Sequence, residues 1–138
     1  MGKDYEEFKK NKKSTKRFLK SFKYAGQGIK YAFYHEQNII VMLFAGIIAV
    51  TLGILFEISY VERLVILVLI GVILAMEMMN TAIEACVNLH DGNKKSHYGK
   101  VAKDCASGAV AIASVLALII GLLIFIPYIL EMFVWKNY

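Results

Sequence analysis

The sequence predicts an all-α membrane protein in which three transmembrane helices follow an N-terminal amphipathic helix. Of its 138 residues, 58% are hydrophobic and the mean hydropathy is +0.54, which is too apolar for an ordinary soluble domain. Three apolar stretches each approach the roughly 20 residues that a helix needs to cross about 30 Å of hydrocarbon. The part of the chain before residue 37 is polar and carries most of the lysines.

The N-terminal region divides into a tail and a helix. Residues 1–15 are dense in lysine, and we expect them to form a basic cytoplasmic tail without a nucleic-acid partner. Over residues 16–36, apolar side chains recur at spacings of three and four while lysines and Arg17 occupy other directions. This pattern is typical of an amphipathic helix that lies on the anionic cytoplasmic leaflet.

One membrane domain is expected over residues 16–130, followed by a C-terminal tail at 131–138. The predicted spans are residues 39–56, 61–87 and 106–130. The connection at 57–60 is so short that the first two spans must form an antiparallel hairpin. We expect the segment at 88–104 to be a loop.

The distribution of basic residues predicts the orientation. Ten Lys and Arg residues precede residue 37 and four lie between the second and third spans, whereas Arg63 and Lys136 alone fall on the other side. By the positive-inside rule, the N-terminus and the 88–104 segment are cytoplasmic and the C-terminus is outside.

Polar residues form a stripe along the second span. At about 100° per residue, they share one narrow face of the predicted helix. The members of the stripe are Glu77, Asn80, Thr81, Glu84 and Asn88. Charged side chains at membrane depth are costly and usually functional. A purely structural alternative is that the stripe joins helices through hydrogen bonds.

Two carboxylates on one face repel each other unless a cation or a proton intervenes. Mg²⁺ suits this site because it takes carboxylate oxygens and shares its shell with substrate phosphates. Beside the stripe, Lys103 can hold phosphate as a point charge and Asp104 can orient the phosphate or the metal. Glu36, at the start of the first span, is a candidate third carboxylate.

These residues resemble the prokaryotic diacylglycerol kinase family, the small trimeric lipid kinases of bacterial membranes, and in particular its Gram-positive branch with the undecaprenol kinases. The segment EMMNTAIEA at 77–85 matches the family pattern E-x-x-N-[ST]-A-I-E-A, and AKD follows at 102–104. The resemblance extends from about Lys16 to Leu130. It implies a homotrimeric helical bundle with shared active sites in the bacterial inner membrane.

The resemblance also implies roles for individual residues. Glu77 would be the general base toward the lipid hydroxyl, with Asn80 positioning the reacting groups. Glu84 and Glu36 would bind the metal that bridges the phosphates of ATP. Lys103 and Asp104 would hold the phosphate and ribose end, and Arg17 and Tyr24 would approach the nucleotide.

Departures from the family pattern lie on the nucleotide side. Asn88 stands where relatives usually carry an aspartate, and Asp91 is a candidate to substitute for it.

The branch favours undecaprenol as the acceptor, and diacylglycerol is the alternative. A small multidrug-type transporter also uses an intramembrane glutamate, but it needs neither the Lys-Asp pair nor the surface helix. A non-catalytic scaffold would tolerate amides in place of Glu77 and Glu84.

Overall fold

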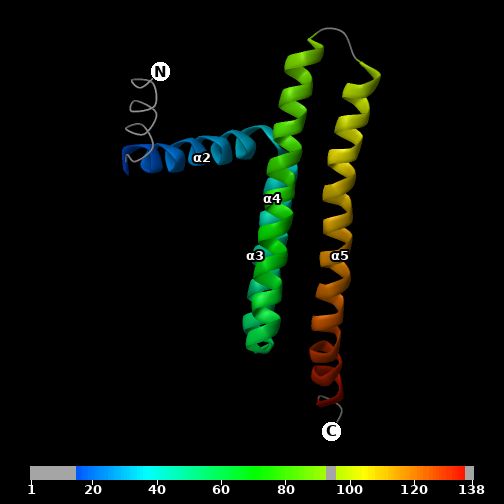
Figure 1. Cartoon of the computed structure of the whole chain (residues 1–138). Coiled ribbons are helices and arrows are strands. Elements are labelled where there is room, and N and C mark those ends of the chain that lie inside the picture. Colours follow the sequence, from blue (N-terminus) through cyan, green and yellow to red (C-terminus); the bar gives the residue numbers. More distant parts are fainter. Residues whose placement is uncertain (1–14, 93–95, 136–138) are drawn as a thin grey trace, which may run out of the picture. The chain divides into compact units, whose positions relative to one another are not determined.

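The computed structural model describes residues 15–92 and 96–135, with side chains for 18–92 and 96–132, and every element in these ranges is a helix (Figure 1). The helices are α2 (Thr15–His35), α3 (Gln37–Leu55), α4 (Tyr60–Asp91) and α5 (His97–Trp135). The predicted tail at 1–15 lies outside the described residues, apart from Thr15. The chain forms two compact units that divide after His35.

The first unit contains α2, whose bounds agree with the helix predicted at 16–36. Apolar side chains are exposed along this helix: Phe18 and Phe22 are 64% and 63% exposed, and their rings meet edge to face at 4.9 Å. Lys30 lies over the ring of Tyr34 at 5.8 Å. Exposed aromatic rings beside lysines are what a helix at a headgroup interface requires.

In the second unit, α3, α4 and α5 are each long and apolar enough to cross a membrane, as the sequence predicts. The helix α4 packs against both α3 and α5. At the end of the bundle near Phe56, the core contains Ile58, Ile66 and Ile124. At 1.5 Å per residue, 32 residues of α4 extend for about 48 Å, so its ends reach beyond about 30 Å of hydrocarbon.

A tight connection joins α3 to α4. The N–H of Ile58 donates to Gly53 O and that of Glu57 to Ile54 O, both at 3.2 Å, which is the Schellman pattern of a helix end. Ser59 then caps α4: its N–H donates to Glu62 Oε2 at 2.8 Å, and its Oγ accepts from Glu62 N at 3.3 Å. The two motifs reverse the chain within four residues, which produces the predicted hairpin.

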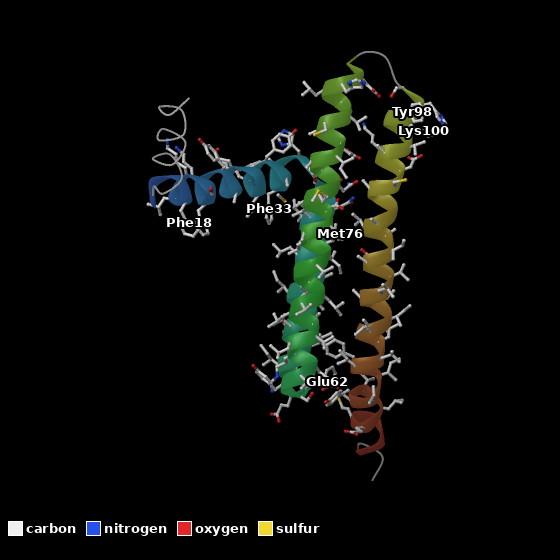
Figure 2. All side chains as sticks on the ribbon, viewed as in Figure 1. Phe18, Phe33, Glu62, Met76, Tyr98 and Lys100 are labelled. Atoms are coloured by element: carbon white, nitrogen blue, oxygen red, sulfur yellow. The ribbon has the colours of Figure 1, made fainter. Side chains whose placement is uncertain are left out.

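The helices α4 and α5 run antiparallel and are tied near both ends (Figure 1). Tyr128 donates to Glu62 Oε2 at 2.8 Å near one end, and Lys103 Nζ donates to Asn88 Oδ1 at 2.7 Å near the other. Figure 2 labels Glu62 at the first end and Lys100, a neighbour of Lys103, at the second. The register of α5 along the polar face of α4 is thereby fixed.

The connection between α4 and α5 is shorter than the loop predicted at 88–104. α4 continues to Asp91, and α5 begins at His97 because Ser96 caps it, with Gly99 N donating to Ser96 Oγ at 2.8 Å. The Asp91 carboxylate accepts from Ser96 N at 3.1 Å and from Ser96 Oγ at 3.0 Å. Gly99 is buried, and a Cβ there would collide with Asp91 Oδ2.

The last helix also extends beyond its predicted end at residue 130. It continues to Trp135 with Pro127 inside it. Proline removes one backbone donor from a helix, and membrane helices tolerate this where neighbouring groups compensate. The start of the predicted tail at 131–138 is therefore helical, and residues 136–138 lie outside the described range.

Candidate functional site

The predicted polar stripe is present on α4, and its deep part is buried. Glu77, Asn80 and Thr81 are 1%, 7% and 6% exposed, and they are the buried polar side chains in the described part of the chain. Glu84 is half-buried and Asn88 is exposed. The stripe thus passes from a closed interior at Glu77 to an open end at Asn88.

Glu77 has an unsatisfied acceptor. Its Oε1 is buried and meets no hydrogen-bond donor among the described residues. The hydroxyl of Thr81 donates to the backbone carbonyl of Glu77 at 3.0 Å, and not to the carboxylate. Burying an unpaired carboxyl oxygen is costly, so this atom is suited to a ligand that brings a donor, such as a hydroxyl group.

Two residues on one face of α5 meet the stripe. Ser107 Oγ lies 3.5 Å from Asn80 Oδ1, and Lys103 Nζ lies 2.7 Å from Asn88 Oδ1. Lys103 and Ser107 are four residues apart, so they project from the same side of α5. The structure therefore brings Lys103 to the stripe, as the sequence predicts. Asp104 is exposed and lies about 100° further round α5.

Glu36 precedes α3 as its N-cap residue, and its side chain makes no capping hydrogen bond. The position of Glu36 along the axis of the helix bundle follows from the contact between α3 and α4. A Cβ on Gly46 would lie 3.2 Å from Ile70 Cγ2, so these two residues are level with each other. Glu36 lies ten residues before Gly46. Asn80 lies ten residues after Ile70 in α4, which runs antiparallel to α3. Glu36 is therefore level with Asn80 along the bundle axis.

The donor set on α4 suits a metal that arrives with a nucleotide better than a resident ion. The described residues contain no group of three or more His, Cys, Asp or Glu side chains arranged to hold a metal. Mg²⁺ commonly takes one or two carboxylates and completes its shell with waters and substrate phosphates. Glu84, half-buried one turn inside Asn88, is the candidate for such a carboxylate.

Arg17 and Tyr24 belong to α2 in the first unit. Tyr24 is 64% exposed, and the side chain of Arg17 lies outside the described residues. Their approach to the nucleotide stays a prediction.

Asp91, the candidate to substitute for an aspartate at position 88, makes its hydrogen bonds at the start of α5. Its carboxylate binds the backbone N–H and hydroxyl of Ser96, and these hydrogen bonds lower the pKa of the Asp91 carboxyl from its ordinary value. The contacts of Ser107 with Asn80 and of Lys103 with Asn88 were not anticipated. The four-residue spacing of Lys103 and Ser107 was the available signal, but it identifies no partner without the register of α4 and α5.

Comparison with known proteins adds to this geometry. The family model described as prokaryotic diacylglycerol kinase matches residues 23–125, which include every proposed site residue except Arg17. A protein named undecaprenol kinase from Bacillus subtilis is 40% identical over 119 residues, covering 86% of this chain and 96% of that protein. One named diacylglycerol kinase from Synechocystis is 34% identical over 116 residues, covering 84% of this chain and 66% of that protein.

Proposed function

This chain belongs to the prokaryotic diacylglycerol kinase family, and on that premise we propose that it is a lipid kinase that phosphorylates undecaprenol with ATP. The observation that carries the proposal is the buried, unsatisfied Glu77 Oε1 at the closed end of the polar stripe. A lipid whose chains remain in the bilayer presents its hydroxyl at the membrane interface, where a carboxylate can receive its proton.

Glu77 is the general base in this mechanism. Its carboxylate takes the proton of the lipid hydroxyl as that oxygen forms a bond to the γ-phosphorus and the bond from the γ-phosphorus to ADP breaks. The amide of Asn80, one turn from Glu77 and in contact with Ser107, orients the hydroxyl. Glu77 and Glu84 are seven residues apart, which is about 10 Å along α4.

The cytoplasmic end of the stripe binds ATP. Lys103 contacts the phosphates, Asp104 holds the ribose end, and Arg17 and Tyr24 of α2 approach the nucleotide. Glu84 and Glu36 would hold Mg²⁺, which would neutralise charge on the phosphates. The phosphate contacts come from these side chains, because the sequence contains no GxxxxGK[ST] motif.

Two acceptors fit this chemistry. Undecaprenol and diacylglycerol each offer a primary hydroxyl on an apolar body. The greater identity to the protein named undecaprenol kinase, and the greater coverage of its length, support undecaprenol. The match to the protein named diacylglycerol kinase keeps diacylglycerol as the second candidate.

The enzyme is a homotrimer in the bacterial inner membrane, with its N-terminus in the cytoplasm and its C-terminus outside. Three helices leave much of their apolar surface exposed in a single chain, and Glu77 lacks a donor among the described residues of that chain. The count of basic residues supports the orientation.

A lipid phosphorylation assay tests the proposal. Purified full-length protein in mixed micelles receives radiolabelled ATP with undecaprenol, diacylglycerol or no lipid, with and without a magnesium chelator. We expect magnesium-dependent label in the lipid fraction and a larger kcat/KM for undecaprenol. A larger kcat/KM for diacylglycerol would reassign the acceptor. No transfer to either lipid would refute the kinase assignment.

A further inference from the structure

A hydrogen bond across the open end of the stripe connects α4 to α5. Lys103 Nζ donates to Asn88 Oδ1 at 2.7 Å, which is short, as expected when the donor is charged. Asn88 follows Glu84 by four residues, so the two side chains lie on the same face of α4, one turn apart. The ammonium of Lys103 is therefore held near the carboxylate that is proposed to bind the metal.

The chemistry of the two groups defines what this contact does. An ammonium has donors only, so the amide of Asn88 must present its oxygen to Lys103. One of the three ammonium donors is used, and two stay available for phosphate oxygens. Because the amide is neutral, it fixes the flexible lysine without cancelling its charge. A ligand that binds a prearranged group loses less conformational entropy.

We propose that Asn88 is a positioning residue, whose carbonyl oxygen holds the Lys103 ammonium beside Glu84 to receive the phosphates of ATP. This inference rests on the proposed function. The Asp91 and Ser96 hydrogen bonds also join α4 to α5 nearby, so the Asn88 contact is not the sole link between the two helices at this end. Both partners in the Asn88 contact are also at the open, solvent-accessible end of the stripe.

The test measures KM for MgATP, kcat and thermal unfolding for full-length variants in mixed micelles. Asn88→Ala removes the acceptor, and we expect KM for MgATP to rise by about tenfold with little change in kcat. Asn88→Asp retains an acceptor oxygen, but its charge offsets that of the ammonium, so we expect KM to rise by less than in Asn88→Ala. Lys103→Met should raise KM at least as much as Asn88→Ala.

The double variant shows whether Asn88 acts through Lys103. Adding Asn88→Ala to Lys103→Met should raise KM no further, because the residue that Asn88 positions is already absent. Lys100→Met is the comparison: Lys100 lies one turn before Lys103 on the same side of α5, and its replacement should raise KM less than Lys103→Met because the hydrogen bond to Asn88 comes from Lys103 (Figure 2).

Each outcome bears on the inference. An unchanged KM in Asn88→Ala would overturn it, as would additive effects in the double variant or an Asn88→Asp enzyme as impaired as Asn88→Ala. A fall in unfolding temperature with unchanged KM would assign the contact to structure alone. These results leave the kinase assignment intact if the wild type phosphorylates lipid. Absence of any transfer by the wild type would refute both proposals.

Discussion

Individual residues on the stripe differ in what surrounds them, and this difference separates their proposed roles. Glu77 is enclosed and has an unsatisfied oxygen, whereas Glu84 is half-buried and lies one turn from Asn88, which accepts a hydrogen bond from Lys103. A base that deprotonates a lipid hydroxyl needs to lie on the membrane side of the stripe, where the lipid presents that hydroxyl at the interface. A carboxylate that binds a metal with phosphates needs access to the cytoplasm.

Replacing Glu77 by glutamine tests the base. An amide of the same shape cannot take the hydroxyl proton, so kcat should fall by about 10²-fold to 10⁴-fold while KM for MgATP changes little. Steady-state assays with saturating lipid measure both parameters. Glu62→Gln is the matched control, because it makes the same change at the other end of α4, where glutamine can also serve in a capping box. Retention of wild-type kcat by Glu77→Gln would remove Glu77 from the chemistry.

Sequence patterns predicted the helical elements well because their signals are local. The length of the apolar stretches predicted the three spans. The recurrence of apolar residues every three or four positions predicted α2, and the helical period predicted the face that Glu77 shares with Glu84. The ends of α5 were wrong for physical reasons. Ser96 and Asp91 convert a polar segment that resembles a loop into a helix start, and the helix continues through Pro127 to Trp135.

The partners of the stripe were harder to predict, because they depend on the register between two helices. Lys103 was expected near phosphate from its position alone, but its contact with Asn88 requires α5 to be placed along α4 to within one turn. No pattern within either helix contains that information. The height of Glu36 along the bundle likewise depends on the register of two helices, α3 and α4, which the contact between Gly46 and Ile70 shows.

The connection between α3 and α4 contains a correctable strain. Glu57 has a φ of 50°, in the left-handed region that favours glycine, and it occupies the position after the helix end where glycine is usual. Glu57→Gly should stabilise the protein by about 1 kcal/mol because the Cβ clash is removed. Unfolding midpoints in detergent measure this change.

The matched control for Glu57→Gly is Ser59→Ala in the same connection. It removes the cap of α4 and should destabilise the protein by about 1 kcal/mol. If Glu57→Gly lowered the unfolding midpoint instead, the side chain of Glu57 would be adding more to the free energy of unfolding than its left-handed backbone conformation removes.

At the scale of the whole molecule, a single chain leaves the site incomplete. The described residues offer Glu77 Oε1 no donor, and large apolar side chains are exposed along all three membrane helices. Lipid can cover the apolar surface, but it offers no donor within the hydrocarbon region. Neighbouring copies of the chain and the bound substrates are therefore the proposed partners of the stripe.

Mixed oligomers test whether active sites are shared between copies. We expect co-expression of Glu77→Gln chains with Arg17→Met chains to recover a measurable part of the activity that each variant lacks alone. The reason is that a site combining α4 of one copy with α2 of another can receive both intact residues.

Differently tagged chains allow mixed trimers to be purified, and their mass should equal three chains with the bound detergent subtracted. Glu77→Gln mixed with Glu77→Gln under a second tag controls for tag effects and should stay inactive. If purified mixed trimers showed no recovery, each site would draw α2 and α4 from one copy, and a mass of one chain would refute the trimer itself.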